Sequence, residues 1–245
     1  MSVVLAIDTS RDDCALACTV LPPGASDPSA DIELGDVAED TRSIPRRHNE
    51  QVLGMLDELL SRALIAPREI DAIVFAAGPG SFTGIRIAAA ISQAIAVAAD
   101  AVILRIGSSR HLAYTVAQRV QTEPGASFWT ALYSRQDSFY AARYERGAAG
   151  LTCTQSDWLM RAGELRDIAD GVIYSDQAAH ARPRGQQSGS PGKEQPVAPD
   201  FLVARPRIRD LLALGCADYL AGLGLSASAA IPLYVDGDTP WHKRS

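Results

Sequence analysis

The 245-residue sequence has few of the residues from which metal centres and disulfide frameworks are built. It contains four cysteines and four histidines. The cysteines form no Cys-x-x-Cys pair, and no histidine lies at zinc-finger spacing from them or four residues from another histidine. A structural zinc site, a helical His-x-x-x-His metal motif and a disulfide framework are therefore unsupported. We expect Cys14 and Cys18 to share one face of a strand as small buried thiols.

The chain also lacks an excess of basic charge and a long apolar run, and its first residues do not resemble a leader peptide. Its formal net charge is −6, and a free-standing nucleic-acid binder needs clustered Lys and Arg to neutralise phosphates. Polar residues interrupt the longest helical apolar pattern before the roughly 20 residues that span a bilayer. The first residues, MSVVLAIDTS, show no basic region or cleavage site of a signal peptide. With 47% hydrophobic residues, we expect a globular, cytoplasmic protein with no membrane contact.

One glycine-rich segment, GPGSFTGIR at 78–86, lacks the standard catalytic fingerprints. It follows an apolar run and precedes a helical pattern, where free N–H groups and the helix dipole suit an anion. Its glycines are spaced GxGxxxG rather than GxGxxG, no Lys-Ser/Thr follows as in a P-loop, and the hydrolase pattern GxSxG is not matched. An anion site and a structural turn, with a helix cap at Ser81 or Thr83, are both compatible with these residues.

Hydrophobic periodicity predicts an α/β organisation for the first part of the chain. The predicted order is three strands, a helix, a strand, a helix, a strand and a helix, over residues 3–7, 14–21, 32–41, 49–64, 71–77, 85–98, 101–106 and 108–120. Helices between strands usually indicate right-handed parallel crossovers, so we expect a three-strand meander joined to parallel strands. The helix over 85–98 is apolar almost all round and must be buried or meet a partner.

The second part repeats this theme more faintly. Strands are predicted over 127–134, 138–145, 151–155 and 171–175, and a helix over 209–224. Residues 182–199 are rich in Pro, Gly, Ser and Gln, which predicts a mobile insertion. We place the boundary between an N-terminal half, 1–106, and a C-terminal half, 107–245.

Three blocks of the sequence together resemble the TsaB family, formerly called YeaZ. They are LAIDTS at 5–10, RRHNEQVLGMLDELL at 46–60 and DAIVFAAGPGSFTGIRIA at 71–88. The likeness covers about residues 3–120 and continues more weakly through ALYSRQDSFYAA and IPLY. It implies an actin-like fold, of the ASKHA and ribonuclease H-like kind, with two α/β halves. Asp8, Thr9 and Ser10 would be a degenerate remnant of its first phosphate loop.

The resemblance also implies a part in making threonylcarbamoyladenosine, the modified adenosine beside the anticodon of some tRNAs. It implies a non-catalytic subunit that pairs with TsaD through N-terminal helices, engages TsaE and meets tRNA indirectly. The stretch corresponding to the TsaD metal motif holds only His111. No cofactor is expected in this chain itself, because ATP and a metal ion would be handled by partner subunits. A homodimer in the absence of TsaD is also compatible with exposed apolar helices.

The candidate functional residues form three sets, and none is predicted to be catalytic. The glycine loop, a candidate anion site, comprises Gly78, Pro79, Gly80, Ser81, Thr83, Gly84 and Arg86. The phosphate-loop remnant comprises Asp8, Thr9 and Ser10. The candidate TsaD interface comprises His48, Leu53, Leu56, Leu60, Ile87 and Ile91, because the helices over 49–64 and 85–98 carry more apolar surface than one sheet face needs.

Two other functions are compatible with parts of the sequence. A stand-alone actin-like ATPase or small-metabolite kinase would use Asp8 and the glycine loop. Such enzymes also need a second acidic phosphate loop, and the chain has Tyr133 where that carboxylate would serve. A glycoprotease-like peptidase rests only on paralogy to proteins once given that label.

Overall fold

The computed structural model describes residues 1–24, 34–120, 123–148, 150–177 and 201–235. The chain forms two compact units, one of Met1–His111 with Pro206–Leu233 and one of Leu112–Arg205 with Tyr234–Ser245. The expected boundary at 106/107 differs from this division in one main respect. The segment Pro206–Leu233 returns to the first unit, although it follows the whole second sheet in the sequence.

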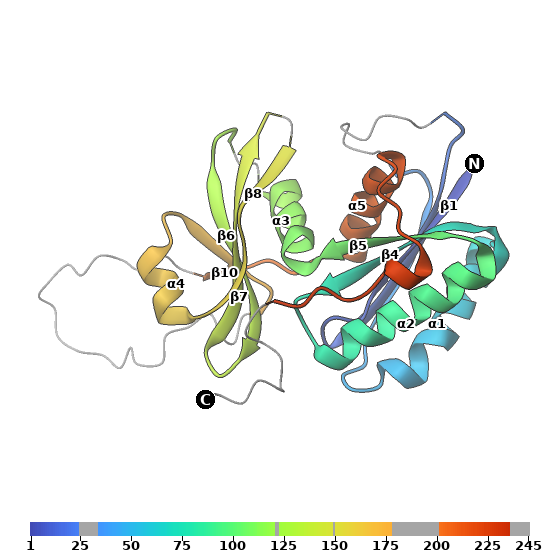
Figure 1. Ribbon diagram of the computed structural model, residues 1–245, viewed down its shortest axis with the longest axis horizontal. Coiled ribbons are helices and arrows are strands. Elements are labelled where there is room, and N and C mark those ends of the chain that lie inside the picture. The colour runs from blue at the N-terminus through green and yellow to red at the C-terminus, as the bar shows by residue number, and fades with distance from the viewer. Residues whose placement is uncertain (25–33, 121–122, 149, 178–200, 236–245) are drawn as a thin grey trace, which may run out of the picture. The chain divides into compact units, whose positions relative to one another are not determined.

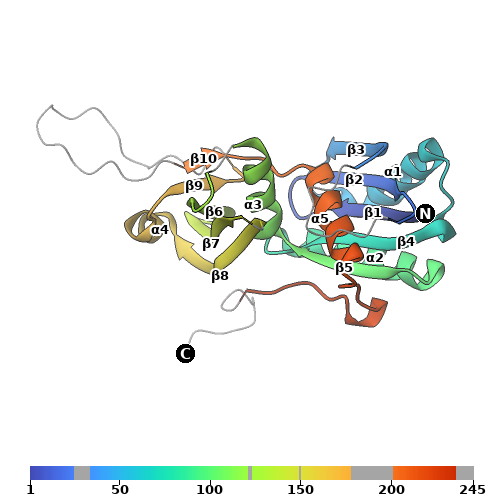
Figure 2. The ribbon, with the colours of Figure 1, turned by 90° about the horizontal axis from the view of Figure 1, so that it is seen from above.

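The first unit is a five-stranded sheet covered on both faces by helices. Its strands lie side by side in the order β3-β2-β1-β4-β5 (Figure 2). Their bounds are Ser2–Asp8 for β1, Asp13–Leu21 for β2, Val37–Ser43 for β3, Ile70–Gly78 for β4 and Val102–Gly107 for β5. The pairs β1–β2 and β2–β3 are antiparallel, and β1–β4 and β4–β5 are parallel. The predicted three-strand meander with parallel strands is therefore present.

Helices α1 (His48–Ala63) and α2 (Phe82–Ala99) cover one face of this sheet, and α5 (Ile208–Leu220) covers the other (Figure 1). Successive residues of a strand point to opposite faces, so Leu5 and Ile7 of β1 pack in the core beneath α1 and α2. On the opposite face, a Cβ at Gly215 of α5 would lie 2.6 Å from side-chain atoms of Val74. Helix α5 therefore sits directly against β4. Two short 3-10 turns, Pro67–Glu69 and Ala227–Ala229, complete the unit.

The second unit has a sheet of the same connectivity, in the order β10-β9-β6-β7-β8. Its strands are β6 (Ser127–Arg135), β7 (Ser138–Gly147), β8 (Gly150–Arg161), β9 (Val172–Ser175) and β10 (Phe201–Val203). Residues from Leu112 onward in α3 (Ser108–Arg119) pack on one face, with Phe128 and Tyr140. Helix α4 (Ala162–Ile168) packs its Leu165 on the other face, against Phe139.

Several sequence predictions need correction. Strand β8 extends to Arg161 rather than ending at 155, helix α5 ends at Leu220 rather than 224, and α4 and β10 were not predicted. The predicted insertion at 182–199 and the start of the predicted third strand lie outside the described residues. Also contrary to expectation, α2 is long and apolar enough, by length and composition alone, to qualify as a membrane-span candidate. The core helix of a soluble protein can have the same length and apolar composition.

Candidate functional site

The buried carboxylate of Asp8, at the end of β1, accepts three hydrogen bonds from its own turn. Its Oδ1 accepts hydrogen bonds from the Ser10 backbone N–H (2.9 Å) and the Ser10 hydroxyl (2.6 Å). Its Oδ2 accepts one from the Arg11 guanidinium at 2.7 Å. The turn from β1 therefore closes on itself and places a fixed positive charge beside the acid. Arg11 was not among the residues that the sequence singled out.

His111, in the first turn of α3, lies near the same Asp8 oxygen as Arg11. Its Nε2 is 2.7 Å from the Arg207 backbone oxygen, which can only accept, so Nε2 carries a proton. Its Nδ1 is 3.7 Å from Asp8 Oδ2 and has no hydrogen-bond partner. In the neutral imidazole, Nδ1 therefore directs a lone pair towards the carboxylate region.

The charge of Asp8 raises the pKa of His111, and the charge of His111 lowers the pKa of Asp8. Burial by itself raises the pKa of Asp8, but the nearby Arg11 and His111 and the Ser10 hydrogen bonds outweigh burial and lower that pKa. Burial lowers the pKa of His111, and the attraction of Asp8 only partly offsets this effect. An ionised Asp8 beside a neutral His111 is the state favoured near neutral pH.

The glycine loop after β4 is tied to the Asp8 turn by hydrogen bonds. The Ser81 backbone N–H donates to the Ser10 carbonyl at 2.8 Å. The Thr9 hydroxyl donates to the Gly84 carbonyl at 2.7 Å. Ser81 is the N-cap of α2, and its hydroxyl accepts from the Gly84 N–H at 3.2 Å, which confirms the helix cap predicted at Ser81 rather than Thr83.

The three loop glycines allow close backbone approaches that any side chain would prevent. A Cβ at Gly84 would overlap the Thr9 carbonyl oxygen, and a Cβ at Gly80 would lie 2.8 Å from the Ser10 carbonyl oxygen. Gly78 has φ of +113°, and a Cβ there would also lie 2.8 Å from the Leu233 carbonyl oxygen. The peptide bond between Gly78 and Pro79 is cis. These contacts are all with the chain's own backbone, as a structural turn requires. Anion binding at the loop stays a prediction.

The outward side of the loop is aromatic and basic. The Arg86 guanidinium carbon lies 3.4 Å from the centroid of the Phe82 ring, a cation–π arrangement. Both side chains and Thr83 are exposed. The exposed part of this loop therefore belongs to the surface of α2 and not to a closed site.

The candidate interface residues on α1 and α2 do not share one environment. His48, Leu56 and Leu60 are buried in the first unit, so these three predicted interface residues offer no accessible surface. Ile87 and Ile91 are half-buried against the core. Only Leu53 is fully exposed, at 61% of its surface. The apolar pattern of these helices is visible in the sequence, but the rotation of each helix relative to the sheet is not.

The structure adds exposed apolar residues that were missed. They are Leu64 just after α1, Phe82 at the start of α2 and Val97 in its last turn, which is 76% exposed. Gly54 is exposed in the middle of α1, and no atom lies within 4 Å of where its Cβ would be. We call the surface formed by Leu53, Gly54, Leu64 and Val97 the outer helix face. The sequence could have predicted these positions, because they lie about half a helical turn away from the buried positions.

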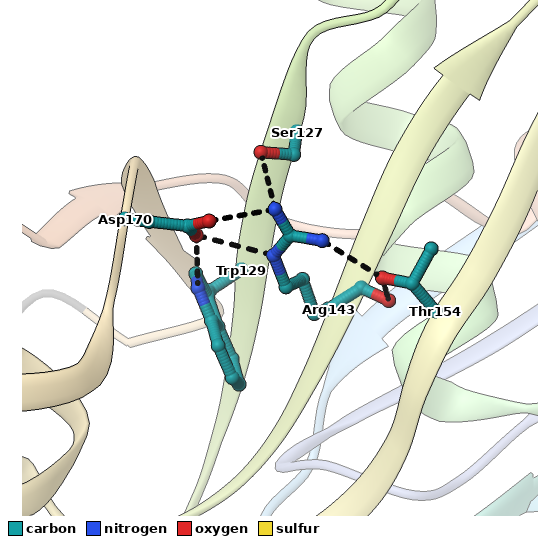
Figure 3. Close-up of polar contacts among 5 residues, drawn as sticks. All are labelled: Ser127, Trp129, Arg143, Thr154 and Asp170. Carbon is teal, nitrogen blue, oxygen red and sulfur yellow. Dashed lines mark hydrogen bonds and ion pairs between the residues drawn. The ribbon is translucent and has the colours of Figure 1, made fainter.

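In the second unit, a polar clamp centred on Arg143 joins three strands (Figure 3). The guanidinium donates to both carboxylate oxygens of Asp170, at 3.1 and 2.7 Å, to the Ser127 hydroxyl and to the Thr154 hydroxyl. The Trp129 indole N–H also donates to Asp170. The Arg143 hydrogen bond lowers the pKa of Asp170. This clamp was not predicted, because its members are far apart in sequence, and its geometry is that of a structural tie.

The backbone at the position of the expected second phosphate loop is also fixed by a hydrogen bond within the chain. Tyr133, near the end of β6, donates its backbone N–H to Asp176 Oδ1 at 3.1 Å. Asp176 follows β9 and is buried. Among the residues that the structure describes, no group of three or more His, Cys, Asp or Glu side chains could hold a metal ion.

Two sheets of identical strand order, one with an aspartate turn after its first strand and a glycine loop after its fourth, define an actin-like α/β protein. The family model of TsaD, tRNA N6-adenosine threonylcarbamoyltransferase, matches residues 42–185. The Bacillus subtilis "tRNA threonylcarbamoyladenosine biosynthesis protein TsaB" is 31% identical over 230 residues, covering 81% of this chain and 93% of that protein. The chain belongs to the TsaB, or YeaZ, family, as the sequence blocks predicted.

Two further relatives match over nearly the whole chain. The Escherichia coli K12 protein of the same name is 26% identical over 247 residues, which cover 98% of this chain and 97% of that one. The solved structure "YeaZ from Pseudomonas aeruginosa" has a TM-score of 0.73 and 25% identity, and covers 96% of this chain and 100% of that chain. The predicted fold class is thereby confirmed.

Proposed function

We propose that this chain is a non-catalytic subunit in the biosynthesis of threonylcarbamoyladenosine in tRNA. It pairs with TsaD, engages TsaE and meets tRNA indirectly in the cytoplasm. The curated relatives carry the name of this biosynthesis. The observation that supports a non-catalytic role is that both oxygens of the Asp8 carboxylate accept hydrogen bonds from the chain's own turn.

In an actin-like ATPase, the aspartate after the first strand orients a metal ion and water. In this chain, one oxygen of Asp8 accepts two hydrogen bonds from Ser10 and the other accepts from Arg11. The Arg11 guanidinium already supplies the positive charge that a metal ion would bring, and it would repel a second cation. ATP and the metal ion are therefore assigned to partner subunits.

The outer helix face is the proposed TsaD contact. A glycine in an exposed helix interior costs about 1 kcal/mol relative to alanine. Nothing in the chain's own packing requires Gly54, since a Cβ there would meet open space. A partner helix approaching closely would require it. Leu53 on α1 and Val97 on α2 provide apolar area that the first unit's core does not use.

Reconstitution tests the function. Modification of tRNA by TsaD, TsaE and a TsaC-type enzyme should depend on this chain, and full yield without it would overturn the proposal. Calorimetry on the isolated chain should detect no binding of Mg-ATP. A clear binding isotherm would instead favour the ATPase or kinase alternative.

Co-expression with the TsaD of the same cell, followed by size-exclusion chromatography, tests the surface. We expect a one-to-one complex that is lost in Leu53→Asp and Val97→Asp. Leu202→Asp is the matched control, because Leu202 is a similarly exposed apolar residue on β10 of the other unit. A complex that survives both helix variants would show that TsaD binds elsewhere.

A further inference from the structure

Two buried nitrogen atoms near Asp8 have no hydrogen-bond partner among the residues that the structure describes. They are Nη1 of Arg11 and Nδ1 of His111. The His111 side chain has no exposed surface, and Asp8 is also buried. Buried polar atoms in folded proteins are nearly always hydrogen-bonded to protein or to ordered water, because an unpaired buried donor or acceptor is destabilising. Both nitrogens therefore need a partner.

The two nitrogens belong to groups that converge on one carboxylate oxygen. Arg11 donates through its other terminal nitrogen, Nη2, to Asp8 Oδ2 at 2.7 Å, and His111 Nδ1 is 3.7 Å from the same Oδ2. The imidazole ring is held in this orientation, because its Nε2 bonds to the Arg207 carbonyl. Besides burial, the charge of Arg11 lowers the pKa of His111, so the guanidinium lies within electrostatic range of the ring.

These groups form a mixed set of donors and acceptors. Arg11 Nη1 can only donate, whereas His111 Nδ1 accepts because Nε2 carries the proton. Asp8 Oδ2 accepts from Arg11 and keeps a further lone pair. A metal cation would be repelled by the guanidinium, and an anion would be repelled by the carboxylate. A water molecule accepts from one group and donates to two, and buried waters typically make about three hydrogen bonds.

The distance between the two acceptors also fits a single water oxygen. At 3.7 Å, His111 Nδ1 and Asp8 Oδ2 are too far apart for a hydrogen bond between them. A water oxygen about 2.8 Å from each of them would bend its two donated hydrogen bonds by only about 10°. A direct bond would instead require a doubly protonated His111, which burial of the ring opposes.

Ser92 of α2 provides a contrast within the same unit. Its hydroxyl is also buried and without a hydrogen-bond partner. The neighbouring turns of α2, however, pack Ala88, Ala89 and Ala96 into the apolar core. A buried water needs two to four polar partners, so one isolated hydroxyl does not make a water site. Convergence of several polar groups distinguishes the surroundings of Asp8.

We propose that one buried water molecule is bound by Arg11 Nη1, His111 Nδ1 and Asp8 Oδ2. The water accepts a hydrogen bond from Arg11 and donates one each to His111 and Asp8. It thereby joins the first turn of α3 to the turn after β1, on which the glycine loop packs. All of these residues belong to the first unit, and the proposal does not depend on the proposed function.

Nitrogen-15 NMR of the histidine-labelled full chain tests the hydrogen bond at His111. The spectrum is recorded at about pH 8, above the ordinary histidine pKa of about 6.5. We expect a neutral ring protonated at Nε2, with the Nδ1 resonance shifted upfield from that of a free unprotonated ring nitrogen. The spectrum of His111→Gln assigns the signal. A protonated Nδ1 would indicate a direct ion pair with Asp8 and overturn the proposal, as would an Nδ1 resonance at the free position.

Oxygen-17 magnetic relaxation dispersion of the solvent tests the water itself, because it detects only water oxygens that stay bound for long times. His111→Phe should reduce the dispersion amplitude by the contribution of one long-lived water, and the matched control Ser92→Ala should leave it unchanged. Circular dichroism melting checks that both variants are folded. An unchanged amplitude in folded His111→Phe, or an equal loss in Ser92→Ala, would contradict the proposed site. If His111→Phe does not fold, the nitrogen-15 spectrum of the wild type decides.

Discussion

The two sheets share one topology, but their strand ends are closed in different ways. In the first unit, the acid follows the central antiparallel strand: Asp8 closes its own turn, and the glycine loop after β4 packs on that turn. In the second unit, the acid follows the parallel strand: Asp176 after β9 holds the backbone of Tyr133 at the end of β6. In both units the carboxylate stabilises the chain's own backbone. The two units therefore share one strand order but use a buried aspartate at different strand ends.

The helices over the two sheets also differ. The first sheet is covered on one face by α1 of 16 residues and α2 of 18, whereas the second carries α4 of 7 residues on the corresponding crossover. Long helices leave an outward face after their core face is buried. This difference is the reason that the proposed TsaD contact lies on the first unit.

The largest expected effect tests whether the glycine loop is closed by backbone contact. Gly84→Ala should lower the free energy of unfolding by about 3 kcal/mol, because the new methyl group overlaps the Thr9 carbonyl and the loop must move. Gly163→Ala in α4 is the control from the second unit, where a Cβ would meet open space. Urea denaturation measures both. Equal effects of the two substitutions would remove the distinction between a required and a spare glycine.

The second prediction concerns the Asp8 turn. Asp8→Asn should lower the free energy of unfolding by about 2 kcal/mol, less than for a wholly buried pair because Arg11 is partly exposed. Since the pKa of Asp8 is lowered in the folded chain, its stabilisation is present above about pH 4 and is lost as the pH falls through the folded pKa. The variant should therefore lose less stability than the wild type on acidification below pH 4. Parallel acid limbs in urea titrations would contradict this assignment.

The third prediction concerns His111. Its pKa is lowered in the folded chain, so the unfolded chain takes up the proton first as the pH falls. The wild type should lose at most about 1 kcal/mol of stability between pH 6.5 and 5.5 through this one group. His111→Gln should remove that slope, and His48→Gln is the histidine control. A slope that persists in His111→Gln would assign the titration to another group.

The smallest expected effect concerns the polar clamp of the second unit. Arg143→Met should lower the free energy of unfolding by about 0.5–1 kcal/mol, because it removes several hydrogen bonds but leaves an Asp170 that water can still reach. Arg135→Met, on the same sheet, is the exposed control. Thermal melts compare the two. A loss of stability as large as that of Asp8→Asn would contradict the expectation that the exposed clamp contributes less than the buried Asp8 turn.

Prediction from the sequence succeeded where one strong local pattern was enough. Local patterns alone predict four elements: apolar runs predict β1 and β4, and helical spacing of apolar residues predicts α1 and α2. The method failed for α4 and β10, which have 7 and 3 residues and carry too few periods to be seen. It also missed Arg11, because arginine is usually exposed to solvent and no local pattern indicates that this one contacts a buried carboxylate.

The family, the strand and helix order of the first unit and the segment that forms the glycine loop can all be read from the amino-acid sequence, because they depend on local patterns and on a distinctive run of residues. The folded structure was needed to show that Pro206–Leu233 returns to the first unit and that His111 and Arg207 meet beside Asp8. It alone also decided which side of α1 stays exposed. These outcomes depend on contacts between residues far apart in the chain, which no local period encodes.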